Sequence, residues 1–412
     1  MDTRPELGTT RATPHPHILA MLLAALSMIG PFAIDTFLPS FPAIAEQFHV
    51  SDTTVLQSLS VYLVAFATMS LFYGTLSDSF GRRRVILMAL AVFSFASLGA
   101  AWAPSFHGLL AARAVQGLSA GAGMVIGLAI VRDWFTGAVA HRLMSHITMV
   151  FGLAPAIAPI IGGFLHASYG WRSVFVFMCA LGVALWLMTW RFVAESLPAE
   201  RRVPFHPASL AGAYAAALRN RRFVARALSC AFGFAGLALY IASAPQFVLR
   251  TLHLPETAFA WLFVPMIGGL VAGSSASGRL ATRLPRPKVL RLGGAIMGVG
   301  AAWNVAYNAI FTATLPWAVL PIMAFTFGLG LVMPVMNLMT MEELPQRSGL
   351  AASLLNFIRT LIFASVSSLV APLLFDSALA LAAGMLVAAL LCGICWWAGQ
   401  ISHSQLPRPD LA

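Results

Sequence analysis

Long apolar stretches separated by short polar loops run along almost the whole sequence, and this pattern constrains the fold more than any other feature. A transmembrane helix requires about 20 mostly apolar residues. Only 9% of the residues are charged, whereas soluble domains carry about 25%. The sequence therefore predicts an all-α polytopic membrane protein with twelve transmembrane helices. We place these helices at residues 18–40, 54–77, 84–103, 107–131, 142–166, 172–193, 223–249, 257–281, 289–311, 315–341, 349–373 and 377–399.

Basic residues are distributed unevenly between alternate loops. When the N-terminus is placed in the cytoplasm, the outer loops hold only Arg172 and Arg250. Because cytoplasmic loops are enriched in Lys and Arg, we expect both termini in the cytoplasm and the chain in the cytoplasmic (inner) membrane. Topology also explains the net charge of +11, so we expect the lipid bilayer, and no nucleic acid, as a partner. Apart from the connector at 194–222, the inner loops contain Arg82, Arg83, Arg84, Arg132, Arg142, Arg279, Arg283, Arg286, Lys288, Arg291 and Arg347.

A polar connector divides the twelve spans into two equal sets. We expect an N-terminal six-helix bundle at 1–193, a cytoplasmic connector at 194–222 and a C-terminal six-helix bundle at 223–412. The basic loop Gly278–Lys288 follows the eighth span as the loop Gly74–Arg84 follows the second, although it lacks an aspartate. Corresponding loops in two six-span halves are typical of parallel internal repeats. The sequence thus predicts two six-helix pseudo-repeats.

The loop after the second span carries the most specific motif of the chain. The spacing of its glycines, aspartate and arginines resembles the signature of the major facilitator superfamily, although Ser79 stands where many members have a basic residue. The resemblance implies the major facilitator fold and transport by alternating access. The candidate gating residues are Gly74, Asp78, Gly81, Arg82 and Arg83.

Further motifs extend this resemblance over nearly the whole chain. Arg113–Gly117 in the fourth span resembles the family's second motif, and Ala158–Gly163 in the fifth span resembles its antiporter motif. Asp35–Pro42 and Tyr169–Arg172 resemble the Bcr/CflA (bicyclomycin-resistance-like) branch of drug:proton antiporters. The resemblance implies a bacterial protein that exports small, chemically diverse drugs or toxic compounds in exchange for protons.

Three charged residues lie inside the predicted spans and more than four residues from either end, namely Asp35, Arg113 and Arg359. Ionisable side chains within a bilayer are costly and usually functional. Asp35 and Arg113 are expected at similar depths, roughly 7 and 9 Å below the outer surface at 1.5 Å per residue, and in the family's fold both of their helices line the central cavity. We predict that Asp35 couples transport to protons, because a proton and a cationic or polar substrate would compete for it. The alternative is that Asp35 is a solvated boundary residue or caps a helix end before Pro39.

The two arginines each have a functional and a structural interpretation. The Arg113 guanidinium stays protonated, so it requires a water-filled cavity or an acceptor. We predict that Arg113 tunes Asp35 or relays protons with Gln116 and water; the alternative is a structural bond to backbone carbonyls. Arg359 lies near mid-membrane in the eleventh span, with Asn356 one turn earlier. Either residue contacts substrate or bonds between helices, and the sequence favours neither.

The motif after the second span also has two interpretations. Gly74 and Gly81 permit close approach of a neighbouring helix, and Asp78 is placed to cap a helix N-terminus or to pair with an arginine. In a gate, such a bond would hold the cytoplasmic side shut in the outward-facing state and break on the return. The alternative is a topology anchor, in which the arginines hold a tight turn inside.

The fifth span combines prolines with glycines. Pro155 and Pro159 each remove a backbone donor from the helix interior. One prediction is a kink or pliant point that permits rocking. The other is close helix packing through Gly162 and Gly163, and both can hold.

Aromatic, methionine and amide side chains are spread over the spans that would line a cavity. Such a surface suits varied amphipathic ligands. Because most side chains of these types in membrane helices face lipid or core, we expect several candidates to lie outside the pocket. The candidates are Tyr62, Tyr240, Gln246, Met333, Asn337, Asn356, Phe357 and Arg359.

The sequence contains no G-x-x-x-x-G-K-[ST] phosphate-binding motif, so we expect a proton gradient as the energy source, without a cofactor. We expect no metal site, a monomer, and small-molecule drugs and protons as the transported species. The main alternative is an uptake or export transporter for a specific metabolite, since fold does not fix substrate. An enzyme or a sensor is disfavoured, because no clustered catalytic set and no large soluble domain are found.

Overall fold

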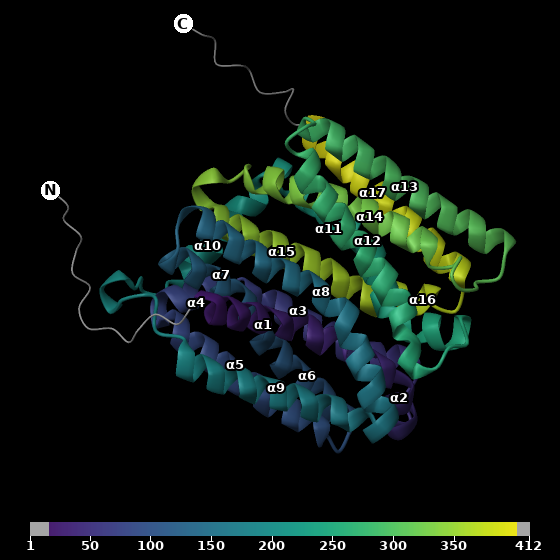
Figure 1. Cartoon of the computed structure of the whole chain (residues 1–412), viewed down its shortest axis with the longest axis horizontal. Coiled ribbons are helices and arrows are strands. Elements are labelled where there is room, and N and C mark those ends of the chain that lie inside the picture. Colours follow the sequence, from purple (N-terminus) through teal and green to yellow (C-terminus); the bar gives the residue numbers. More distant parts are fainter. Residues whose placement is uncertain (1–15, 402–412) are drawn as a thin grey trace, which may run out of the picture.

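A computed structural model describes residues 16–401, and every regular element in this range is a helix (Figure 1). The N-terminal half consists of α1 (Pro16–Asp35), η1 (Leu38–Ser40), α2 (Phe41–Phe48), α3 (Asp52–Ser70), α4 (Tyr73–Phe80), α5 (Arg82–Ala101), α6 (Phe106–Ala120), α7 (Ala122–Trp134), α8 (Gly137–Tyr169) and α9 (Trp171–Phe192). The connecting segment contains η2 (Ala199–Arg201) and α10 (Pro207–Arg219).

The C-terminal half consists of α11 (Arg221–Ala242), η3 (Gln246–Thr251), η4 (Glu256–Phe259), α12 (Ala260–Leu280), α13 (Arg286–Ile310), α14 (Leu320–Met341), η5 (Pro345–Arg347), α15 (Ser348–Ser365), η6 (Val366–Val370), α16 (Ala371–Leu374) and α17 (Ala378–Ile401). Both η3 and η6 are π-helical, and each prolongs a long α-helix of this half.

The prediction of twelve transmembrane helices is confirmed. Within the described residues, 12 helical segments are long and apolar enough to cross a membrane. The largest departure is the first segment, which continues through a turn and a short 3-10 helix as far as Phe48. The fourth is also divided, at Gly121, into α6 and α7.

Polar side chains at several helix starts explain where the spans begin. The Ser51 side chain accepts a hydrogen bond from the Thr54 backbone N–H at the start of α3, and Ser105 does the same for Gly108 in α6. Asn220 caps α11 by accepting from two backbone N–H groups. Such caps satisfy donors that a helix leaves unpaired at its N-terminus.

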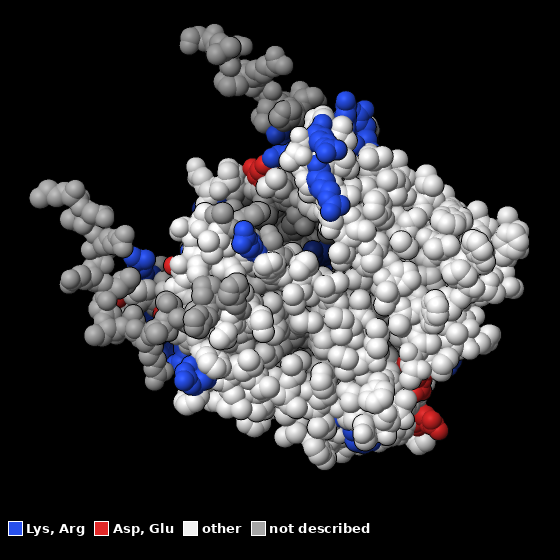
Figure 2. Space-filling view, in the orientation of Figure 1, with Lys and Arg blue, Asp and Glu red and all other residues white. Residues whose placement is uncertain are grey.

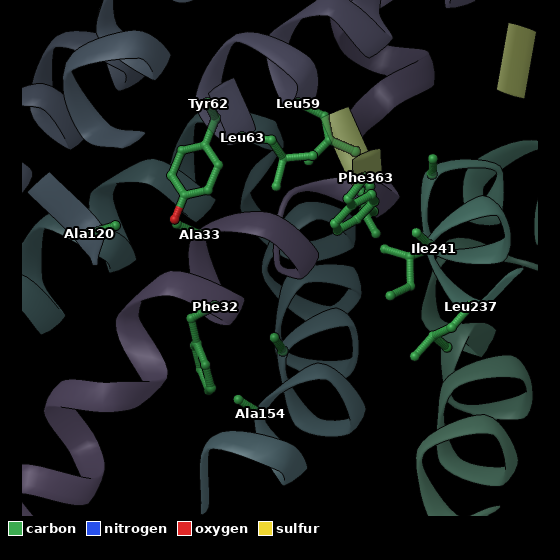
Figure 3. Packing of buried hydrophobic residues seen from close by; sticks show 14 of the residues in the cluster. Phe32, Ala33, Leu59, Tyr62, Leu63, Ala120, Ala154, Leu237, Ile241 and Phe363 are labelled. Carbon is green, nitrogen blue, oxygen red and sulfur yellow. The ribbon is translucent and has the colours of Figure 1, made fainter. Parts of the chain in front are cut away.

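The helices pack into two sets that meet along two contacts. In the first set, α1 packs on α7, α8 and α9, while α5 packs on α6 and α9. In the second, α14 packs on α12 and α13, and α17 packs on α11 and α13. The sets meet where α3 lies against α15 and where α8 lies against α12 (Figure 1). Phe363 of α15 lies beside Leu59 and Leu63 of α3 in this seam (Figure 3).

The outer surface of the bundle suits a lipid environment. Large apolar side chains such as Met21, Phe95 and Leu373 are more than two-thirds exposed. Figure 2 shows few charged side chains across the middle of the molecule, because the charges gather towards its two ends. We name these ends the motif face, where α4 joins α5, and the opposite face, where α3 and α9 begin.

Candidate transport site

Asp35 lies where the first span is interrupted. It is the last residue of α1, before the turn that leads into η1. Its side chain is 2% exposed, and Oδ1 has no hydrogen-bond partner in the described part of the chain. Asp35 therefore ends α1, as the prediction of a position near a helix end requires, although the apolar segment continues through η1 and α2 to Phe48. Its depth in the membrane stays a prediction. Ionisable side chains inside membrane spans commonly mark ion or substrate pathways.

Arg113 is enclosed by aromatic rings and polar groups. Its guanidinium carbon lies 4.2 Å from the Phe37 ring centroid and 4.3 Å from that of Tyr62. Its Nη1 donates to Gln116 Oε1 and its Nε to the Ser58 carbonyl at 3.4 Å. The side chain is 0% exposed. Cation–π contacts and these acceptors stabilise a charge that water does not reach.

Asp35 and Arg113 belong to one cluster, but they do not form an ion pair among the described contacts. Phe37, two residues after Asp35, and Tyr62 both lie over the Arg113 guanidinium. The Tyr62 hydroxyl donates to the Gly30 carbonyl of α1 at 3.0 Å. Gln116, the other predicted member, donates to Ser97 Oγ at 2.8 Å. The cluster therefore joins α1, α3, α5 and α6 through side chains.

The loop Gly74–Arg84, here called the motif loop, forms a network with the segment that follows α9. Arg82 pairs with Asp78 and, through Nε at 3.2 Å, with Asp133 of α7. Glu195 accepts hydrogen bonds from the backbone N–H groups of Arg82 at 2.8 Å and Arg83 at 3.2 Å. Asp78 thus pairs with an arginine, as one of its two predicted roles required. Glu195, and not Asp78, caps the N-terminus of α5.

The two motif glycines differ from each other. Gly81 has φ +97°, and a Cβ atom there would lie 2.5 Å from Glu195 Oε2. A Cβ atom on Gly74 would meet nothing within 4 Å. The prediction that both glycines admit a neighbouring helix is therefore wrong for Gly74. At Gly81 the neighbour is a carboxylate of the connecting segment.

The fifth span packs closely through its glycines, as one prediction required. Helix α8 continues through Pro155 and Pro159. A Cβ atom on Gly162 would lie 1.8 Å from the Thr36 carbonyl oxygen, next to Asp35 in the chain. A Cβ atom on Gly163 would lie 2.3 Å from the Glu256 carbonyl oxygen of the other half. A kink at the prolines stays a prediction.

The predicted pocket residues separate into buried and half-buried groups. Tyr62 and Tyr240 are fully buried, and Tyr240 accepts a hydrogen bond from Asn304 at 2.7 Å. Gln246 is 4% exposed. These three side chains pack into the helix bundle, so in this conformation they do not line an open pocket as predicted. The half-buried candidates are Met333, Asn337, Asn356, Phe357 and Arg359.

Two contacts between ionisable side chains of the two halves are not predicted by the sequence. Arg250 pairs with Asp52, and His166 Nε2 lies 3.0 Å from Glu256 Oε2. Both pairs lie at the opposite face, where they hold α3 and α8 of one half against η3 and η4 of the other. The two residues of each pair are about 90 or more positions apart in the chain, so no local sequence pattern predicts these contacts.

The connecting helix α10 also contacts both halves, at the motif face. Tyr214 donates to the Leu71 carbonyl at 2.8 Å and bonds with Ser353 of α15. Burial raises the pKa of the Tyr214 phenol, and the bond with Ser353 opposes this shift. The connecting helix α10 therefore rests partly on the bundle.

The Tyr169–Arg172 motif has a clear role at the opposite face. Trp171 Nε1 and Arg172 Nη1 both donate to Gln47 Oε1, at 2.7 and 2.6 Å. Gln47 lies on α2, the last part of the first span. The motif thus fixes the end of the interrupted span against α9.

Twelve membrane-length helices in two packed sets, with a buried carboxylate where the first is interrupted, define a multi-pass membrane transporter rather than an enzyme. The sequence profile of the Major Facilitator Superfamily matches residues 21–368. The chain belongs to this superfamily.

Bacterial relatives match most of the chain. The "Uncharacterized MFS-type transporter YdgK" of Bacillus subtilis is 31% identical, over 85% of this chain and 88% of its own. The "Bicyclomycin resistance protein homolog" of Haemophilus influenzae is 29% identical, over 88% and 90%. "Multidrug resistance protein D" of Escherichia coli is 28% identical, over 94% and 98%. These relatives support placing the chain in the drug:proton antiporter branch.

Solved structures show the same fold. A bacterial homolog of the human lysosomal transporter Spinster superposes with a TM-score of 0.73 at 16% identity, covering 97% of this chain and 100% of that one. The human organic anion transporter MFSD10 superposes with a TM-score of 0.69 at 17% identity, covering 94% and 100%. The predicted major facilitator fold is therefore confirmed.

Proposed function

We propose that this protein exports small, chemically diverse drugs or toxic compounds across a bacterial inner membrane in exchange for protons. The observation that carries the proposal is Asp35. It is the one acidic residue of the described chain that lies within a span and away from the span's ends. The names of the Haemophilus and Escherichia relatives support drugs as the substrate class.

In the proposed cycle, Asp35 alternates between a proton and a substrate. A buried, ionised carboxylate without a full set of hydrogen bonds is costly, so Asp35 is stabilised by whichever partner reaches it. A substrate that enters from the cytoplasm displaces the proton, and a proton that enters from outside displaces the substrate. Arg113 and Gln116 position the cluster around Tyr62 and make the exchange sensitive to charge. The proton gradient supplies the energy, and the scheme requires no cofactor.

The proposed orientation places the motif face in the cytoplasm. Among the described residues, Arg172 and Arg250 are the basic residues at the opposite face, and the positive-inside rule places that face outside. In this conformation the halves meet at the outer face through the Arg250–Asp52 ion pair and the His166–Glu256 contact. The described side-chain contacts of Asp78 and Arg82 stay within the N-terminal half. We propose that Asp78 contacts the other half when the cytoplasmic side closes.

Transport in proteoliposomes tests the function. The purified protein is reconstituted with a pH-sensitive dye inside, and a cationic drug such as ethidium is added with and without an imposed pH gradient. We expect the pH gradient to drive the drug against its own concentration gradient. We also expect movement of the drug to carry protons in the opposite direction. An Asp35→Asn variant should lose this coupling, whereas Asp376→Asn, at an exposed position, should keep it. Drug movement that is indifferent to the pH gradient would refute the proposal.

A deletion strain distinguishes the metabolite alternative. The proposed function predicts that loss of the protein increases sensitivity to several unrelated drugs. Unchanged drug sensitivity, together with failure to grow on a single nutrient, would instead assign the protein to transport of that metabolite.

A further inference from the structure

Arg359 is an arginine in mid-membrane to which the proposed cycle gives no role. It lies on α15, near the middle of the segment Pro345–Leu374. Its side chain is half-buried, in contrast to the fully buried Arg113. Figure 2 shows the surface hollowed over α11 and α15. Arg359, on α15, is a cation within the helix bundle whose side chain is not fully closed to solvent.

The contacts of Arg359 leave its charge uncompensated. Its Nη2 donates to the Asn356 side-chain carbonyl at 2.8 Å. Its guanidinium carbon lies 5.5 Å from the ring centroid of Phe234 on α11. Both partners are neutral, and none of the ion pairs in the described part of the chain includes Arg359.

The acidic residues of the same half are engaged elsewhere or exposed. Glu256 contacts His166, Glu342 pairs with Arg286, and Glu343 pairs with Arg226. Asp376 is exposed at the opposite face. None of them lies within ion-pair distance of Arg359, so the protein itself supplies no counter-charge among the residues described.

Arg113 and Arg359 differ in how far neighbouring groups enclose them. Arg113 is stacked between two rings, bonded to Gln116 and Ser58, and closed to solvent. Arg359 has one ring contact and one side-chain acceptor, and it keeps a solvent-accessible part. A guanidinium presents five N–H donors in a fixed fork, so most of the donors of Arg359 remain available.

We propose that Arg359 binds an anionic group, such as a carboxylate, on the transported compound. A planar guanidinium matches a carboxylate with two parallel hydrogen bonds, and the attraction is stronger away from bulk water. Phe234 and the half-buried Phe357 supply aromatic surface for a ring system attached to that group. The inference rests on the proposed function, and it adds to it a preference for those transported amphipathic compounds that carry an anionic group.

A matched pair of fluorescent probes tests this proposal on the purified protein. Dansylglycine carries a carboxylate, and dansylglycinamide replaces it with a neutral amide on the same fluorophore. We expect wild type to bind dansylglycine about tenfold more tightly than the amide. A charge-assisted hydrogen bond that adds about 1.4 kcal/mol to binding corresponds to a tenfold difference in Kd. Equal affinity for the two probes, or binding of neither, would overturn the proposal.

Variants identify Arg359 as the source of the preference. Arg359→Gln should lose the tenfold preference while it binds the amide as wild type does, and Arg359→Lys should keep part of it. The control Arg283→Gln removes an exposed arginine of the same half and should leave both affinities unchanged. A folded Arg359→Gln protein that keeps the full preference would also overturn the proposal. If that variant does not fold, the Lys variant and the wild-type probe pair decide.

The outcome of this binding experiment does not depend on the antiport proposal. It is performed without a pH gradient, so loss of coupling at Asp35 does not alter its result. Proton-coupled export of cationic drugs without any carboxylate preference would overturn the Arg359 proposal alone. A carboxylate preference without proton coupling would support the proposal for Arg359 and refute the proposal of proton antiport.

Discussion

At the scale of single residues, the motif loop shows that identical residue types serve different purposes. Gly81 adopts φ +97°, in the left-handed region that disfavours any side chain, and it also makes room for the Glu195 carboxylate. Gly74 is helical and has open space around it. The resemblance to the family signature treats both glycines alike. The structure gives a physical requirement for Gly81 only.

Alanine substitution separates the two glycines. Gly81→Ala should destabilise the protein by about 1–3 kcal/mol, because a non-glycine residue at this φ is strained and its Cβ would displace Glu195. Gly74→Ala should be neutral or slightly stabilising, since alanine favours a helix. The midpoint of thermal unfolding in detergent measures both. Equal midpoints for the two variants would contradict this account of the loop.

At the scale of helices, the fifth span and the interrupted first span form the junction between the halves. Gly162 brings α8 against Thr36, beside Asp35, and Gly163 brings it against Glu256 of the other half. Two adjacent positions of one helix, which point in different directions, therefore touch the candidate proton site and the contact at the opposite face. This arrangement offers a direct route by which proton occupancy at Asp35 affects the contact between the halves.

Swapping the charges of Asp52 and Arg250 by mutation tests whether this pair closes the opposite face. Asp52→Arg should open this face, because it places like charges together, and Arg250→Asp should do the same. The double variant should restore closure. Arg250 is 65% exposed, so we expect the effect to be modest, about 1 kcal/mol or less. Hydrogen exchange of α2 and η4, followed by mass spectrometry, reports the opening. A double variant that exchanges as fast as the single variants would exclude this pair as a latch.

The Asp78 gate is tested by separating turnover from binding. Asp78→Asn keeps a polar side chain of the same size but removes the charge that pairs with Arg82. If Asp78 closes the cytoplasmic side in the opposite conformation, transport should slow several-fold while drug affinity in detergent stays unchanged. Unaltered turnover would return the motif to the role of a topology anchor.

At the scale of the whole molecule, the sequence predicted the number and positions of the spans well but the contacts between them poorly. Spans follow from runs of apolar residues, which are local. The pairing of Asp35 with Arg113 was inferred from depth along two helices, and depth does not specify which way a side chain points. Glu195 is missed because the segment after α9 folds back on the motif loop, and Asp133 because α7 brings it to that loop from a distant part of the chain. Such contacts depend on the tertiary arrangement, which no local pattern encodes.

The central claim is that substrate and proton compete for Asp35. Proton release from the purified protein in weakly buffered detergent tests it most directly, because no gradient, vesicle or second step intervenes. We predict that adding a transported cationic drug to wild type releases protons, that Asp376→Asn does the same, and that Asp35→Asn binds the drug without release. Release from Asp35→Asn equal to that from wild type would contradict the account and assign the coupling to another group.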